Sequence, residues 1–333
     1  MKQTLLATLI VASLLMSCGK DENTDTQPAF KLFVGVSETD KTSYLPSYTS
    51  WKDGIASSFN GGTVVDMVVD GNDVYATGFS DNSVTNKTYV MVWKNGKADT
   101  LGTSDIYMTS SAIYVSNHDV YVVGRESGLS TNATGKLWKN GVLTTLRKGD
   151  YDYIPNDLVV VGNDIYITGY ISQGGGVSSG MLWHNGEVTS LGGSGAEGIS
   201  VFVSGTDVYV GGYVYKDFVG QVATLWKNGK EITLGKGADY EMVNDVFVNG
   251  KDVYAGGYTL NNQNIRGMIW KNGVDSAIAY DKKFSGVSRI FVKDGDEYVL
   301  GNLGDTAILW KNGVPKKLTD GTKKAAGVGL FVN

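Results

Sequence analysis

The chain has little of what most catalytic and metal sites need. Its 333 residues include a single cysteine, Cys18, which excludes an intramolecular disulfide and a thiolate metal cluster. The two histidines, His118 and His184, each replace another polar residue in a repeated turn, which argues against a histidine-centred triad or a histidine-rich metal site. A formal net charge of −5 argues against a nucleic-acid partner, whose recognition needs a basic face. We therefore expect no metal, no cofactor and no nucleic-acid partner.

The N-terminal residues have the pattern of a processing and anchoring segment. Leu5 to Met16 is mostly apolar but too short to span a bilayer, and no later run approaches twenty apolar residues. Leu15-Met16-Ser17-Cys18 resembles the lipobox of bacterial lipoproteins, and Lys20-Asp21-Glu22 resembles the surface-export signal of lipoproteins in Bacteroidota. The resemblance implies a signal peptide over residues 1–17, a lipid such as palmitate on Cys18, and attachment to the outer membrane at the cell surface. A secretory peptide with an incidental cysteine remains the alternative. Residues 18–29 are expected to be a polar tether.

All seven tryptophans open the same tetrapeptide, in which Lys or His, then Asn or Asp, then Gly follows the Trp. They are Trp51, Trp93, Trp138, Trp183, Trp226, Trp270 and Trp310, between 40 and 45 residues apart. A period in that range is typical of repeated small sheets. Each unit holds four β-rich runs, and its Asn-Gly step predicts a tight hairpin turn with positive φ at both central residues. The sequence therefore predicts an all-β fold of four-stranded repeats.

The two ends of the repeat region complement each other. Six complete units begin near Val64, Ala112, Asp157, Ser200, Asp245 and Arg289. Residues 330–333 match a first strand, whereas residues 30–59 supply a second, third and fourth strand. We predict one domain over residues 30–333, a seven-bladed β-propeller with four-stranded blades, closed by a split blade shared between the N- and C-termini. The pattern resembles β-propeller repeats of bacterial lipoproteins, without the full WD or Kelch signatures, so the activities of those families are not carried over.

The first strand of each unit is apolar on both faces. One face carries, in repeat order, Val68, Tyr114, Val159, Phe202, Phe247, Phe291 and Phe331. A strand that is apolar on both sides has to be covered on both sides. We interpret this row, together with the tryptophans and a recurring tyrosine of the second strand, as packing between blades.

Two groups of residues are candidates for ligand binding. The loops joining the second and third strands are long and varied, and with the connections between blades they form a variable loop face whose candidates are Tyr170, Tyr213, Tyr240 and Tyr258. At the start of the first strands, Asp66, Asp157, Asp245 and Arg289 are expected to form a polar ring beside the central channel, suited to a cation or a polar ligand. For both groups a purely structural role remains open. Six Asp residues of the first turns are expected to accept backbone hydrogen bonds: Asp73, Asp119, Asp164, Asp207, Asp252 and Asp296.

These features favour a non-catalytic, lipid-anchored binding module, monomeric, whose ligand is a glycan or an envelope protein on the variable loop face. One alternative is a carbohydrate-active enzyme that uses the carboxylates near the axis, since paired acids hydrolyse glycosides without histidine. The other is a structural platform in an envelope complex.

Overall fold

The computed structural model describes residues 32–42, 46–52, 55–82, 84–128, 131–147, 150–173, 177–278 and 285–332. The chain from Lys31 onward forms one compact unit. The expected signal peptide, Cys18, the tether and Asn333 lie outside the described residues. Every regular element in the described ranges is a β-strand. In the same ranges we find no helix with the length and apolar character that crossing a membrane requires.

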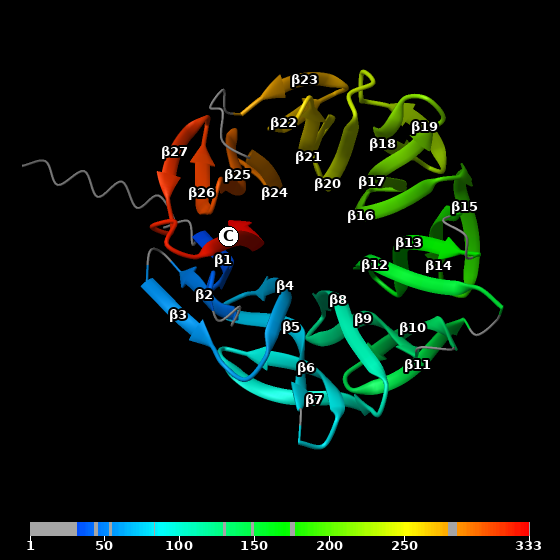
Figure 1. The fold of residues 1–333 in the computed structure, drawn as a ribbon, viewed down its shortest axis with the longest axis vertical. Helices are drawn as coiled ribbons and strands as arrows, with labels where there is room; N and C mark the ends of the chain where they lie inside the picture. Colours follow the sequence, from blue (N-terminus) through cyan, green and yellow to red (C-terminus); the bar gives the residue numbers. More distant parts are fainter. Residues whose placement is uncertain are drawn as a thin grey trace, which may run out of the picture. The chain divides into compact units, whose positions relative to one another are not determined.

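The strands form six hydrogen-bonded sheets arranged around a common axis (Figure 1). Four of these sheets have four strands each, and within each sheet the strands follow one another in the sequence. The first two contain β4 (Thr63–Asp70), β5 (Asp73–Asn82), β6 (Lys87–Lys94) and β7 (Lys97–Ser104), and then β8 (Tyr107–Ser116), β9 (Asp119–Gly128), β10 (Thr131–Lys139) and β11 (Val142–Arg147). The other two contain β12 (Asp152–Val161), β13 (Asp164–Ser172), β14 (Ser178–His184) and β15 (Glu187–Ser194), and then β24 (Ser285–Lys293), β25 (Asp296–Leu303), β26 (Thr306–Lys311) and β27 (Val314–Lys317). The prediction of an all-β propeller with four-stranded blades is confirmed.

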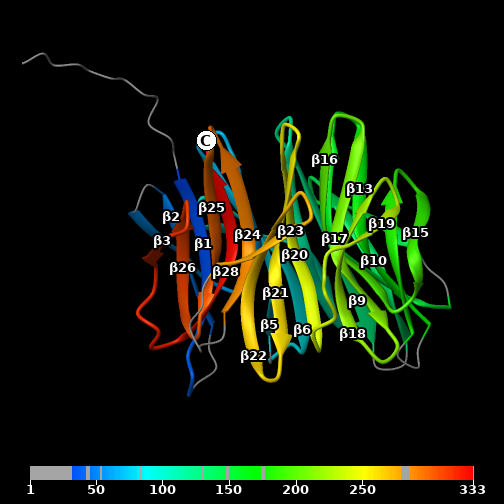
Figure 2. The ribbon, with the colours of Figure 1, turned by 90° about the horizontal axis from the view of Figure 1, so that it is seen from above.

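A fifth four-stranded sheet joins the two ends of the compact unit. It contains β28 (Lys324–Val332), β1 (Leu32–Thr39), β2 (Pro46–Lys52) and β3 (Ile55–Phe59), in that order. β1 and β28 are antiparallel, with a register that runs from Leu32↔Val332 to Thr39↔Lys324. The innermost strands contact one another in the cyclic order β4, β8, β12, β16, β20, β24, β28 and back to β4. Figure 2 shows the same unit edge-on, with the strands crossing its thickness.

The sixth sheet departs from the expected seven separate four-stranded sheets, because it has eight strands. It contains β16 (Ala196–Ser204), β17 (Asp207–Lys216), β18 (Gly220–Lys227), β19 (Lys230–Thr233), β20 (Tyr240–Asn249), β21 (Asp252–Asn261), β22 (Asn264–Lys271) and β23 (Val274–Ala277). A single parallel pairing, Gln221↔Tyr240, links its two halves. The cause is local: β19 stops at Thr233, and Gly220 has no Cβ to hold off the carbonyl oxygen of Asp239. The free edge of β18 therefore accepts the first residue of β20.

Six of the seven repeated tryptophans pack in the interior between repeats, as predicted, and the side chain of Trp51 lies outside the described part of the structure. Trp138 on β10 is buried in one cluster with Val68 and Tyr75 of the preceding sheet. Trp226 on β18 packs in the same way against Val159. Trp93, Trp183, Trp270 and Trp310 are buried as well. Because an indole ring removes a large apolar area from water, these six rings contribute strongly to holding the repeats together.

The tryptophan motif also explains the uniform turns. In the second sheet Asn140 and Gly141 have φ values of 50° and 81°, as a two-residue hairpin turn requires. The Asn140 side chain donates to Asp119 (2.7 Å) and accepts from the Val120 backbone N–H (2.8 Å), while Lys139 forms an ion pair with Asp119 at 2.9 Å. Equivalent contacts join Asp73, Asp164, Asp207, Asp252 and Asp296 to the Asn of the neighbouring turn. The expectation that these Asp side chains accept backbone hydrogen bonds was wrong, since they bind Asn and Lys or His side chains.

Candidate functional site in the axial cavity

A β-bulge in each first strand positions the candidate residues. In β4 the register against β5 shifts between Val64 and Asp66. A Cβ on Gly78, the residue paired with Val64, would collide with the carbonyl oxygen of Thr63. The same register shift and the same kind of glycine recur in five further strand pairs, at Gly124, Gly169, Gly212, Gly257 and Gly301. A bulge leaves one backbone N–H without a partner within the sheet and re-aims the following side chain. The sequence analysis missed the bulge, although the recurring glycine was its signal.

The three predicted aspartates bind backbone groups of the next sheet around the axis. Asp66 accepts from the Ile113 N–H at 2.9 Å, Asp157 from the Val201 N–H at 2.8 Å and Asp245 from the Ile290 N–H at 2.7 Å. Each donor lies just after the bulge of its own strand, where the sheet ladder is interrupted. These carboxylates therefore satisfy buried N–H groups that would otherwise be costly, and they fasten adjacent sheets to one another.

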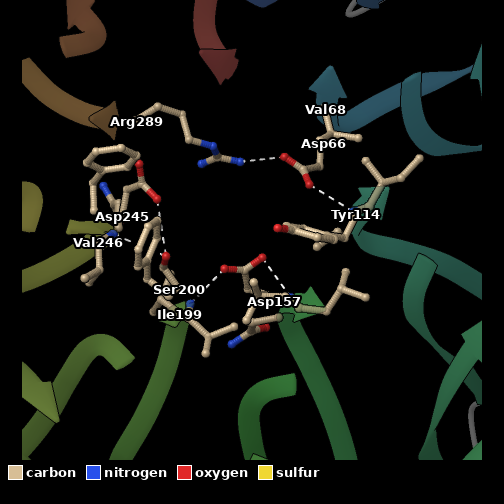
Figure 3. Close-up of a pocket in the computed structure, with 18 of the residues that line it drawn as sticks. Asp66, Val68, Tyr114, Asp157, Ile199, Ser200, Asp245, Val246 and Arg289 are labelled. Carbon is tan, nitrogen blue, oxygen red and sulfur yellow. Dashed lines mark hydrogen bonds and ion pairs between the residues drawn. The ribbon is translucent and has the colours of Figure 1, made fainter. Parts of the chain in front are cut away.

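Arg289 completes the polar ring from across the sheet β28-β1-β2-β3. Its Nη2 lies 2.9 Å from Asp66 Oδ1, although 223 residues separate the two in sequence. The strand between them, β28, has Gly329 at the corresponding position, so no side chain there blocks the arginine. Ser200 donates to Asp245 at 3.2 Å (Figure 3). The four polar residues predicted from the sequence thus lie together, with Ser200 as a fifth member.

These residues line one cavity on the axis, with a volume of about 570 Å³. Its wall continues with the row predicted to pack between blades, namely Val68, Tyr114, Val159, Phe202, Phe247, Phe291 and Phe331. We call this row the aromatic collar. Rings of successive repeats contact one another, with centroid distances of 5.1 Å for Phe202 and Phe247 and 4.6 Å for Phe247 and Phe291. The packing interpretation was therefore incomplete, because the collar also forms the apolar part of a cavity wall.

Burial and mutual charge shift the acid–base equilibria in this cavity. Burial raises the pKa of Asp157 to about 7, and the charges of Asp66 and Asp245 add to that rise. Burial also raises the pKa of Asp245 to about 6, against the opposing effect of Arg289. Burial acts to lower the pKa of Arg289, but the carboxylates of Asp66, Asp245 and Asp157 outweigh it and keep the guanidinium charged. Asp157 differs from Asp66 in that no basic side chain of the described ranges forms an ion pair with it.

The cavity does not present a metal-ion site. Within the described residues, no group of three or more His, Cys, Asp or Glu side chains comes close enough together to hold a metal ion. The carboxylates bind backbone N–H groups of different strands instead of converging on one point. Hard cations prefer a site in which several carboxylate oxygens converge on the ion. The carboxylates of this cavity do not form such a site.

Of the four tyrosines predicted on the variable loop face, Tyr170 and Tyr258 lie close enough to Tyr213 to affect its pKa, and Tyr240 lies on the strand that pairs with the strand of Tyr258. Tyr170, Tyr213 and Tyr258 occupy the second strands of successive sequence repeats. Tyr213 is buried, pairs with Glu197 across the ladder and hydrogen-bonds its carboxylate; burial and then that charge raise the pKa of Tyr213. Tyr240 is 47% exposed at the start of β20. None of the four is among the residues that line the axial cavity.

Comparison with known proteins supports the fold and nothing finer. No family model and no curated protein matches the sequence. The β-propeller domain of the trilobed protease from Pyrococcus furiosus is similar in structure, with a TM-score of 0.60, 10% identity, and coverage of 86% of this chain and 94% of that one. An acylaminoacyl peptidase from Pyrococcus horikoshii gives a TM-score of 0.55 at 13% identity, covering 86% and 50% of the two chains. A prolyl endopeptidase structure gives 0.53 at 12% identity, covering 84% and 46%. This chain corresponds to about half the length of those two peptidases.

Proposed function

We propose that this protein is a binding module of the bacterial envelope, held to the outer membrane by a lipid on Cys18, which takes a small ligand into the axial cavity. The carrying observation is the convergence of four polar residues and the aromatic collar on one cavity of about 570 Å³. Ligand sites are usually concave, mostly apolar and furnished with a few placed polar groups, and this volume falls within their usual range. The axial cavity replaces the variable loop face as the favoured site, because none of the four candidate tyrosines lines it.

The proposal includes a seven-bladed ring. On this reading β16–β19 and β20–β23 are two blades joined by the single Gln221↔Tyr240 pairing, and the sheet β28-β1-β2-β3 is the split blade that closes the ring. The cyclic contacts of the seven innermost strands support this reading. An enclosed axial cavity depends on such closure, since an open stack would leave its wall incomplete.

Native mass spectrometry of the purified full chain after exposure to a small-molecule extract tests the binding function. The cavity-filling variant is Val159→Phe, which introduces the residue already present at the equivalent positions Phe202 and Phe247. We expect a bound species on the parent protein that Val159→Phe loses, and that the surface control Tyr240→Ala retains. Retention by Val159→Phe together with loss in Tyr240→Ala would return the site to the variable loop face. Incorporation of labelled palmitate that disappears in Cys18→Ser tests the anchor.

A second candidate function is favoured by one observation. Asp157 and Asp245, with pKa values of about 7 and about 6, are two carboxyl groups of the kind that transfer protons near neutral pH. A glycoside hydrolase would use one as acid and one as base. Against this, both already accept backbone hydrogen bonds that join the sheets. Turnover of a chromogenic glycoside that is lost in Asp157→Asn, with the fold intact, would favour the enzyme.

A further inference from the structure

The polar ring of the axial cavity carries an excess of negative charge. It holds three carboxylates, Asp66, Asp157 and Asp245, against one guanidinium, that of Arg289, a balance of −2 when all are ionised. Arg289 is committed to Asp66 at 2.9 Å. Asp245 is bound by the Ser200 hydroxyl and by a backbone N–H. Two charges remain without a counter-charge, those on Asp157 and Asp245, and of these two only Asp157 accepts from no side chain of the described residues.

Asp157 has unused acceptor capacity toward the cavity. Among the described residues, its Oδ1 accepts only the N–H of Leu158, and its Oδ2 only that of Val201, both at 2.8 Å. Each oxygen of a carboxylate has two lone pairs, so one site on each oxygen remains. Figure 3 shows the Asp157 carboxylate on the cavity wall, facing the side from which the Tyr114 ring projects inward. The charges that act on Asp157 come from Asp66 on β4, Asp245 on β20 and Arg289 on β24.

The aromatic collar gives the same cavity a surface that is suited to a cation with an apolar body. Tyr114, Phe202, Phe247, Phe291 and Phe331 all line it. Aromatic faces attract organic cations by an electrostatic interaction of about 0.5–2 kcal/mol, and they also cover apolar carbon. The excess negative charge would repel a ligand that carries a carboxylate or a phosphate. A bare metal ion would make no use of the apolar surface of the aromatic collar.

From these observations we infer that the axial cavity binds a small organic cation, with an ammonium group on Asp157 and its apolar body against the aromatic collar. This inference rests on the proposed function and names its ligand class. Binding needs the ionised carboxylate, whereas the empty protein holds a proton on Asp157 below about pH 7. Cation binding at pH 6 is therefore coupled to release of that proton.

The test uses three probes of matched shape on the full chain in detergent: phenethylamine, the neutral 2-phenylethanol and the anionic phenylacetate. We expect isothermal titration calorimetry at pH 8 to show the amine binding at least about tenfold more tightly than the alcohol, a difference of about 1.4 kcal/mol. Phenylacetate should bind more weakly than either. With a carboxyl pKa of about 7, the amine should bind about tenfold more weakly at pH 6 than at pH 8. The alcohol should show no such dependence.

Variants separate the carboxylate from the cavity. Asp157→Asn keeps an oxygen for the Val201 N–H and should lose the preference for the amine, whereas Asp157→Glu should retain part of it. Val159→Phe should weaken the amine and the alcohol alike. The pH dependence in the unmodified protein needs no variant, so poor folding of one variant does not decide the matter. Equal binding of amine and alcohol, both abolished by Val159→Phe, would overturn the cation inference and leave the proposed function standing. Binding of all three probes unaffected by Val159→Phe would overturn both.

Discussion

Replacing Asp66 by alanine gives the sharpest test of how the polar ring holds the propeller together. The change removes two interactions at once, the ion pair with Arg289 at 2.9 Å and the acceptor of the Ile113 N–H at 2.9 Å. Breaking a buried pair by removing one partner typically costs about 3–5 kcal/mol. The Arg289 side chain is 30% exposed and that of Asp66 only 12%, so water in the cavity screens part of the arginine, and about 2–3 kcal/mol is the better figure. A buried N–H left without an acceptor adds about 1–3 kcal/mol.

We therefore expect Asp66→Ala to lower the free energy of unfolding by about 4 kcal/mol, measured by urea denaturation with unchanged dependence on urea. Arg289→Met removes the charge from the other side and leaves the Ile113 N–H satisfied, so its cost should be smaller. In the double variant neither partner of this ion pair is left alone, and the two effects should fall short of their sum by at least about 1 kcal/mol. An Asp66→Ala loss below about 1 kcal/mol, or strictly additive effects, would refute the role that we assign to this pair.

Two further predictions concern the cavity and the bulge. Burial raises the folded pKa of Asp157 from 3.8 to about 7, so between about pH 4 and pH 7 the folded protein binds a proton that the unfolded chain has lost, and stability falls as pH rises through that window. Asp157→Asn should reduce this dependence in urea midpoints taken at pH 5 and pH 8, and the part that remains is expected from Asp245, whose pKa burial raises to about 6; an unchanged dependence would contradict the role of Asp157. Gly257→Ala places a Cβ against the carbonyl oxygen of Met242 and should cost about 1–3 kcal/mol by calorimetry. The exposed Gly193→Ala, which meets no atom within 4 Å, should be nearly neutral, and equal effects of the two changes would contradict the bulge argument.

Repetition made much of the fold predictable. Each unit repeats the same Trp and Asn-Gly positions, so the hairpin turn predicted for one unit was predicted for all of them. The φ values of Asn140 and Gly141 agree with that prediction. The alignment of repeats also placed Asp66, Asp157 and Asp245 at equivalent points of first strands, which is why they line one cavity. Residues at equivalent positions of a sequence repeat occupy the same place on each four-stranded unit, so they lie at the same distance from a common axis when the units are arranged around it.

The remaining features depend on contacts between repeats that differ from one another. Arg289 reaches Asp66 because the intervening strand has Gly329. This contact depends on residues of three different units, so no single repeat predicts it. The pairing of Gln221 with Tyr240 depends on a short β19 and on the missing side chain of Gly220. Likewise, the row of Phe202, Phe247 and Phe291 reads as core from its hydrophobicity alone. Only the geometry of the ring shows that one edge of that row faces an open cavity.

Closure of the ring is the claim on which the cavity depends, and a disulfide across the two ends tests it most directly. Ser37 and Ala326 face each other in the β1–β28 register, and Ala326 is exposed. Directly opposite residues of antiparallel strands lie about 4.5–5.5 Å apart at Cα, within the range that a disulfide spans. In a Cys18→Ser background, Ser37→Cys/Ala326→Cys should oxidise quantitatively and raise the melting temperature, whereas Ser37→Cys/Ala325→Cys should not, because adjacent residues point to opposite faces. Failure of the first pair to form a disulfide in the folded protein, or equal oxidation of both pairs, would contradict the closed ring.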